Sequence, residues 1–197
     1  MVKNKIIISG KARTGKNTLA EMLCAETHST SEIEYKIFAF ADPMKEMVML
    51  MFPSTNPQVL WGPSELRSTI VPGETGKTYR DLLIEIGKLG RSYDPDIWIN
   101  ATIGSINKFL NKMEFGEISN RLAVCADCRF SNELNAVKNN DFVTIRIIRP
   151  NNDYIVDDVS EKDLDDVPDN FFNFIVVNDG TLEELKTKAK SIIAKLQ

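Results

Sequence analysis

Residues near the N-terminus have the types and spacing of a phosphate-binding loop. The segment Gly10-Lys-Ala-Arg-Thr-Gly15-Lys16 has the pattern Gly-x4-Gly-Lys, after an apolar run at 5–9 and before a helix-forming run at 19–23. Glycines let successive backbone N–H groups turn around a phosphate, the helix N-terminus adds its dipole, and the lysine adds a mobile positive charge. An ordinary strand-to-helix turn is the alternative. The pattern favours a nucleotide-phosphate site made of Gly10, Lys11, Ala12, Arg13, Thr14, Gly15, Lys16, Asn17 and Thr18.

The residue after Lys16 departs from the usual loop. Serine or threonine normally stands there and ligates Mg2+ through its hydroxyl, whereas this chain has Asn17 followed by Thr18. An amide oxygen can ligate Mg2+ or hold one of its waters. Asn17 could equally do no more than cap the helix, and the residue pattern leaves both interpretations open.

Composition limits the function classes. The chain has 197 residues, 43% of them hydrophobic, and a formal net charge of −4, with a pI near 5.2. These values predict one domain with a substantial core. We expect neither a protein that coats nucleic acid nor a membrane-spanning segment, and we expect the protein to be cytoplasmic. Cys125 and Cys128 form a C-x-x-C inside an apolar run, which favours buried small hydrophobic residues over a redox pair. The acidic stretch Asp157–Asp169 lacks the spacing of a calcium loop and is expected to be solvated.

The order of apolar and amphipathic segments predicts an α/β fold with a five-stranded parallel sheet covered by helices on both faces. Strands are expected at 5–9, 36–41, 122–127, 142–148 and 173–177. Helices are expected at 16–27, 42–51, 77–90, 95–113, 131–139 and 181–196. The single domain 1–197 should carry an inserted helical subdomain at about 42–115, in which 52–78 is expected to be a mobile loop over the site.

Arginines stand mostly at loops and element ends. Phosphoryl transfer needs guanidinium groups to hold a second phosphate and to offset charge on the transferring group. Ligands of a parallel sheet bind at the carboxyl ends of its strands, where several of these arginines should gather. Any one of them alone is more often a surface ion-pair partner than a ligand. The arginines in question are Arg13, Arg67, Arg80, Arg91, Arg129 and Arg149.

Five segments, in the right order, resemble the bacteriophage deoxynucleoside monophosphate kinases of the P-loop nucleoside monophosphate kinase superfamily. They are the loop 10–18, Phe38-Ala-Phe-Ala-Asp-Pro-Met-Lys45, Thr78-Tyr-Arg-Asp-Leu-Leu83 with Gly87, Arg91 and Trp98, Ala126-Asp-Cys-Arg-Phe-Ser-Asn-Glu133, and Arg146-Ile-Ile-Arg149-Pro150 with Asn178-Asp-Gly180. Three positions, Ile84, Glu85 and Leu89, depart from the family pattern, and Val159 replaces a frequent histidine. These departures put base selectivity in question more than catalysis.

The resemblance implies transfer of the γ-phosphate of ATP to the 5′-phosphate of a deoxynucleoside monophosphate, in phage nucleotide supply, with Mg2+. Lys16, Arg13, Asp127 and Arg129 are implied as catalytic, Asn17, Thr18 and Asp127 as metal-holding, and Arg149 and Asn178 as further ATP-side residues. The implied substrate-binding residues are Asp42, Lys45, Trp61, Arg67, Tyr79, Arg80, Arg91 and Trp98. Core packing is the stronger reading for Trp98.

Two rival functions remain at this stage. A P-loop kinase of another small acceptor would share the donor site. A P-loop ATPase or GTPase acting as a switch would carry an Asn-Lys-x-Asp motif or a strand ending Asp-Glu, whereas Asp127 is followed by Cys128 and Arg129. The partner expected is the small-molecule substrate, without nucleic acid or membrane, and a homodimer is left open.

Overall fold

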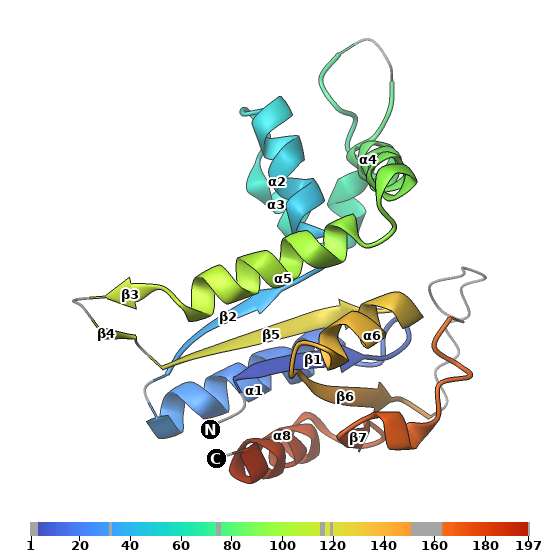
Figure 1. The fold of residues 1–197 in the computed structure, drawn as a ribbon. Helices are drawn as coiled ribbons and strands as arrows, with labels where there is room; N and C mark the ends of the chain where they lie inside the picture. The colour runs from blue at the N-terminus through green and yellow to red at the C-terminus, as the bar shows by residue number, and fades with distance from the viewer. Residues whose placement is uncertain are drawn as a thin grey trace. The chain divides into compact units, whose positions relative to one another are not determined.

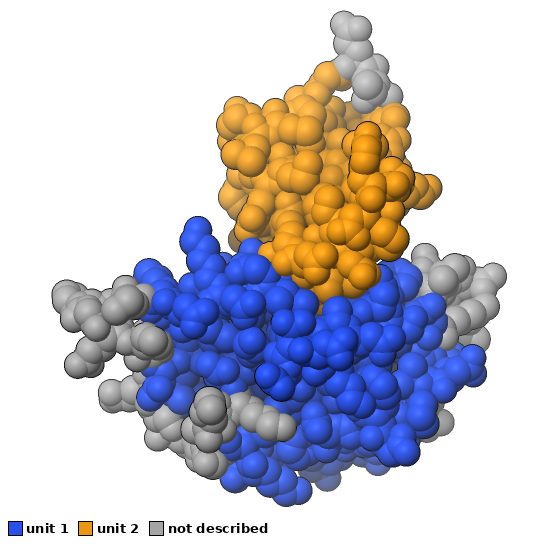
Figure 2. Space-filling view, viewed as in Figure 1, with its two compact units in different colours: residues 1–39, 103–197 blue, residues 40–102 orange. Residues whose placement is uncertain are grey.

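The computed structural model describes residues 4–31, 33–73, 76–114, 117–118, 120–150 and 163–196. The chain divides into two compact units. Unit 1 comprises residues 1–39 and 103–197, and unit 2 comprises residues 40–102 (Figure 2). Each unit has its own buried core.

Unit 1 is built on a five-stranded parallel sheet in the order β2-β5-β1-β6-β7 (Figure 1). The strands are β1 (Lys5–Ser9), β2 (Glu34–Phe38), β5 (Arg121–Cys128), β6 (Val143–Ile148) and β7 (Phe174–Val177). The three inner strands are nearly continuous apolar runs because both of their faces are covered. The α/β fold class expected from the sequence is confirmed.

Helices cover both faces of this sheet. Helix α1 (Lys16–Ser31) packs against α8 (Leu182–Leu196), and both share a core with alternate strand residues such as Ile6, Ile8 and Val124. On the opposite face lie α6 (Ser131–Lys138) and the second half of α5 (Ile97–Leu110) (Figure 1). A short 3-10 turn, η2 (Asp169–Phe171), precedes β7, and the hairpin of β3 (Met113–Glu114) and β4 (Glu117–Ile118) precedes β5.

Unit 2 is helical. It contains α2 (Asp42–Met51), α3 (Pro57–Trp61), the 3-10 helix η1 (Ser64–Ser68), α4 (Tyr79–Tyr93) and the start of α5. Its core consists of the buried residues Val48, Leu60, Val71, Tyr79, Ile86 and Trp98. Thr78 and Asp81 form a capping box that starts α4 by satisfying its first N–H groups.

Residues 52–78 were predicted to be a loop, whereas the described part of this segment contains a short helix and a 3-10 helix. Asn56 accepts a hydrogen bond from the Gln58 N–H at 3.0 Å, and Pro57 takes the first helical position, so α3 begins here. Leu60 and Val71 are buried, and Ile70 bridges to Thr78. The described residues of this segment, 52–73 and 76–78, therefore contribute Leu60 and Val71 to the core of unit 2.

Two boundaries also differ from expectation. The second strand was predicted at 36–41 but ends at Phe38, so Asp42 is the first residue of α2 and not the end of a strand. The insert predicted over 42–115 corresponds to a unit that ends at residue 102, because the second half of α5 packs with unit 1. There Phe109 makes an edge contact with Phe38, with ring centroids 5.8 Å apart.

None of the helices in the described part of the chain is both long and apolar enough to cross a membrane.

Candidate functional site

The glycine-rich loop joins β1 to α1 through backbone that its two glycines make feasible. A Cβ on Gly10 would lie 2.5 Å from the Ile147 carbonyl oxygen. Gly15 has φ +98°, and a Cβ there would lie 2.7 Å from the Asn178 amide nitrogen. Arg13 also has a positive φ, 60°, which is uncommon for a residue with a side chain. The loop thus has the tight, left-handed backbone that a phosphate cradle needs.

Lys16 projects its ammonium into this loop. Its Nζ donates to the carbonyl oxygens of Gly10 at 2.5 Å and Lys11 at 2.8 Å, and the residue is only 8% exposed. The Thr14 hydroxyl donates to the same Lys11 carbonyl at 2.8 Å. A lysine held on loop carbonyls is placed where it can exchange them for phosphate oxygens.

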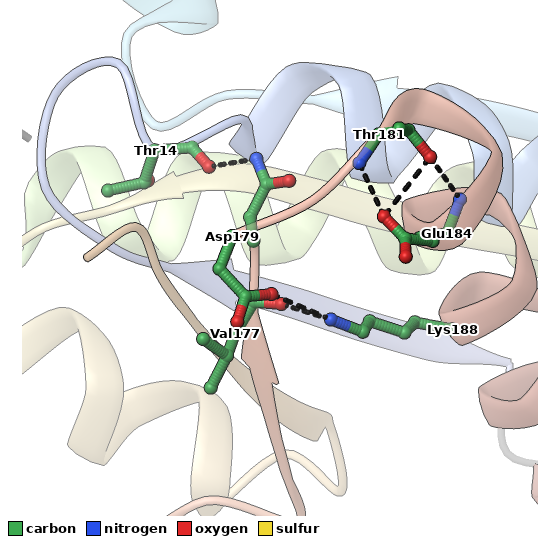
Figure 3. Close-up of polar contacts among 7 residues, drawn as sticks. Thr14, Val177, Asp179, Thr181, Glu184 and Lys188 are labelled. Carbon is green, nitrogen blue, oxygen red and sulfur yellow. Dashed lines mark hydrogen bonds and ion pairs between the residues drawn. The ribbon is translucent and has the colours of Figure 1, made fainter. Parts of the chain in front are cut away.

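Asn178, which directly follows β7, holds the glycine-rich loop in place. Its side-chain amide donates to the Thr14 carbonyl at 2.9 Å (Figure 3). Its backbone N–H donates to the Ile148 carbonyl at 2.7 Å. The contact ties the loop to the carboxyl ends of β6 and β7. Asn178 thus supports the backbone of the loop. The sequence did not predict this contact because Asn178 and Thr14 are 164 positions apart.

The start of α8 keeps Asn178 in place. Thr181 and Glu184 form a reciprocal cap, with the Thr181 N–H donating to Glu184 Oε2 at 2.6 Å. Lys188 donates to the Val177 carbonyl at 2.5 Å and lies 3.3 Å from Asp179 (Figure 3). The turn between β7 and α8 is therefore held at both ends.

Asp127 lies on the strand next to the loop. It is the penultimate residue of β5, and the register pairs Ser9 of β1 with Cys128. The carboxylate is half-buried and accepts a hydrogen bond from the Cys125 thiol at 3.4 Å. The structure thus places Asp127 beside the start of the glycine-rich loop.

The oxygen atoms around the loop suit a Mg2+ ion that binds together with nucleotide phosphates. In the described residues no three His, Cys, Asp or Glu side chains gather into a metal cage. Mg2+ bound with nucleotides usually takes only one or two protein ligands, with waters and phosphate oxygens completing the octahedron. The oxygen donors of Asn17, Thr18 and Asp127 would suffice, and Asn17 is exposed whereas Thr18 and Asp127 are half-buried.

The turn after Asp127 is held by a carboxylate that sequence reasoning did not single out. Glu133 Oε2 accepts the backbone N–H groups of Arg129 at 2.8 Å and Phe130 at 3.0 Å. Burial raises the pKa of Glu133 to about 7, although these hydrogen bonds lower it in part, and the charge of Asp127 raises it further. Glu133 thereby fixes the backbone at Arg129 and Phe130. An acid three positions into a helix that follows a strand was the available signal.

The three cysteines are buried and free. Burial raises the pKa of Cys24 to about 12 and raises the pKa values of the Cys125 and Cys128 thiols well above the ordinary range. Lys16 partly counteracts this at Cys128, which reflects its closeness to the loop. Thiols this basic are poor nucleophiles, in agreement with the predicted packing role.

In unit 2, three predicted substrate-side residues form one cluster. Asp42 Oδ1 accepts from the Lys45 ammonium and from the Trp61 indole N–H, both at 3.0 Å. The Lys45 ammonium also lies 5.7 Å from the Trp61 ring centroid. Lys45 is buried and Trp61 is 44% exposed, so the indole presents a face to solvent on a fixed support.

Two arginines of unit 2 are close enough to repel each other. The pKa of Arg67 is lowered, first by burial and then by the charge of Arg80, with Glu65 opposing. The Arg67 Nε is buried without a hydrogen-bond partner among the described residues. Arg80 donates to the Ser64 carbonyl at 3.0 Å. A like-charged guanidinium pair of this kind is suited to an anion.

The remaining predicted residues of unit 2 divide between surface and core. Arg91 is exposed on α4, the helix that also carries Arg80. Tyr79 is 3% exposed, and its hydroxyl pairs with that of Thr55 at 2.8 Å. Trp98 is 8% exposed and donates to the Gly87 carbonyl at 3.2 Å. The two aromatic residues therefore pack the core of unit 2.

The two remaining arginines that were expected on the ATP side both follow the carboxyl ends of strands in unit 1. Arg13 is exposed on the glycine-rich loop, and Arg149 is exposed directly after β6. Because ligands of parallel sheets bind at the carboxyl ends of the strands, both are placed for a role near the loop.

No protein-family model matches the chain, and no curated protein matches it in sequence. Among solved structures, a gluconokinase from Sinorhizobium meliloti 1021 is similar at a TM-score of 0.43 and 11% identity, covering 99% of this chain and 94% of that chain. The sheet order and the loop geometry of this chain itself establish its fold class.

Proposed function

We propose that this protein is a P-loop kinase that transfers the γ-phosphate of ATP to the 5′-phosphate of deoxynucleoside monophosphates. The observation that carries the proposal is the phosphate-binding loop, with two glycines that tolerate no side chain and a lysine held inside it. The resemblance of five segments to the phage kinases supports the choice of acceptor.

On the donor side, the loop amides and Lys16 bind the ATP phosphates. Phosphoryl transfer leaves little covalent work for the protein, so catalysis rests on positioning and charge compensation. Asp127, with Thr18 or Asn17, would hold Mg2+, which would supply positive charge to the phosphates. Arg129, whose backbone N–H is held by Glu133, and Arg13 supply further positive charge to the transferring group.

On the acceptor side, the proposal uses the cationic side chains of unit 2. The Arg67 and Arg80 pair binds the acceptor phosphate, with Arg91 on the same helix, because an anion relieves the repulsion between the two guanidinium groups. The exposed indole of Trp61, fixed by Asp42, stacks on the acceptor base.

A coupled assay with ATP, Mg2+ and each deoxynucleoside or ribonucleoside monophosphate tests the proposal. We expect ADP release that depends on a deoxynucleotide, and a loss on the order of 10^2–10^4 in rate for Lys16→Ala. Lys186→Ala, which removes an exposed lysine on α8, is the matched control.

A second pair of variants separates the two sides of the reaction. Arg80→Ala should raise the KM for the deoxynucleotide at least tenfold and leave ATP affinity unchanged, whereas Lys88→Ala on the same helix should change neither. ADP release that needs no acceptor would identify an ATPase instead. Activity only with another hydroxyl or phosphate acceptor would leave the donor site intact and reject the deoxynucleotide.

A further inference from the structure

The acidic segment that follows β6 was expected to be solvated, yet its described part contacts the phosphate-binding loop. Residues 157–162 of that stretch lie outside the described residues. The Lys11 ammonium of the loop pairs with Asp165 at 2.8 Å. The Ser131 N–H, at the start of α6, donates to Asp163 Oδ2 at 2.6 Å. Two carboxylates of one short segment thus contact an ammonium and a backbone N–H, both of which attract anions.

Arg146 of β6 anchors this segment. Its guanidinium donates to the Leu164 carbonyl at 2.8 Å and pairs with Asp169 at 2.7 Å. The group also lies 4.3 Å from the centroid of the Phe172 ring, and the side chain is only 15% exposed. The Val167 N–H closes a turn on the Leu164 carbonyl at 3.3 Å. Asp163 and Asp165 therefore project from a supported turn.

The groups that these carboxylates contact belong to the rim of the donor site. Lys11 lies between Gly10 and Arg13 in the loop, and its carbonyl accepts from Lys16. Ser131 follows directly after Arg129 and Phe130, whose N–H groups are taken by Glu133. A nucleoside triphosphate in the loop would bring several negative charges beside Lys11, where one carboxylate already neutralises the ammonium.

We propose that residues 163–165 form an anionic strap that competes with nucleotide phosphates for the rim of the phosphate-binding loop. The Asp165 carboxylate pairs with the Lys11 ammonium in the free protein, and binding of a nucleoside triphosphate displaces this carboxylate. The strap thereby lowers the affinity for ATP and favours release of the bound nucleotide. The inference rests on the donor site of the proposed function and is independent of the identity of the acceptor.

The test measures MgATP binding by calorimetry, without acceptor. We expect Asp165→Asn to bind MgATP about two- to fivefold more tightly than the parent, as an exposed ion pair of ordinary strength implies. Asp166→Asn is the matched control, because it removes the same charge from the same turn at an exposed side chain with no ion pair or hydrogen bond among those described. Asp163→Asn should act in the same direction as Asp165→Asn.

A double-mutant cycle shows whether the effect passes through Lys11. In a Lys11→Ala background, Asp165→Asn should change MgATP affinity no more than Asp166→Asn does. The strap is refuted if Asp165→Asn weakens binding, if it equals Asp166→Asn in the parent, or if its effect persists without Lys11.

The same titrations separate the strap from the donor site itself. MgATP binding that Lys16→Ala abolishes, together with equal affinities for Asp165→Asn and Asp166→Asn, would reject the strap and keep the nucleotide site. A parent that does not bind MgATP would reject both.

Discussion

The buried carboxylate of Glu133 should make the stability of the protein depend on pH in a defined direction. Its pKa is about 7 in the folded chain, against 4.5 for an unperturbed glutamate. The folded state therefore binds more protons than the unfolded state between these values, and the free energy of unfolding falls as the pH rises from 4.5 to 7. A difference of 2.5 pKa units corresponds to about 3 kcal/mol in total, most of it between pH 5 and pH 8.

Glu133→Gln removes the titration and keeps an oxygen that can accept the N–H groups of Arg129 and Phe130. We expect the variant to resemble the parent near pH 5 and to exceed it by about 2–3 kcal/mol at pH 8. For a chain of this size that gain corresponds to about 5–10 °C in melting temperature.

Thermal or urea unfolding of both proteins from pH 5 to pH 8 measures the gap. Glu46→Gln, which makes the same change at an exposed glutamate, is the control. A gap for Glu133→Gln that is constant, or that shrinks as the pH rises, would show that burial does not raise the pKa of Glu133 and would refute the reasoning.

Three further changes have expected outcomes. Asp127→Asn should lower the rate far more than Asn17→Ala when turnover is titrated with Mg2+, because only the aspartate supplies negative charge; equal curves would make Asp127 structural. Tyr79→Phe should cost about 1–2 kcal/mol in urea unfolding, because it leaves the buried Thr55 hydroxyl without its partner. Thr181→Ala should cost about 1 kcal/mol by loss of the α8 cap, read as a shift in melting temperature, and a shift of zero would contradict the capping role.

The parts of the structure that the sequence predicted are those set by neighbouring residues. The first strand, the glycine-rich loop and the start of α1 form one local pattern, since each glycine and Lys16 acts on backbone within a few positions. The parallel sheet followed from its apolar runs. Thr181 and the acidic residues after it predicted the start of α8 in the same way.

The parts that it did not predict depend on contacts between distant positions. Asn178 supports Thr14 from 164 positions away, and Asp165 reaches Lys11 across 154. Glu133 could be recognised as a capping residue, but its raised pKa comes from burial that only tertiary packing creates. The composition of 52–78 signals turns, yet Leu60 within it is buried by the rest of unit 2.

The central position of β1 has a consequence for the order in which the chain folds. Ile6 pairs with Val124 on one side and with Val143 on the other, so the first strand to be synthesised has no neighbour until β5 and β6 exist. The helices of unit 2 contact one another over short separations and can form earlier. We expect the sheet to assemble late on the ribosome, with the glycine-rich loop among its last features to become rigid although that loop directly follows the first strand of the sheet.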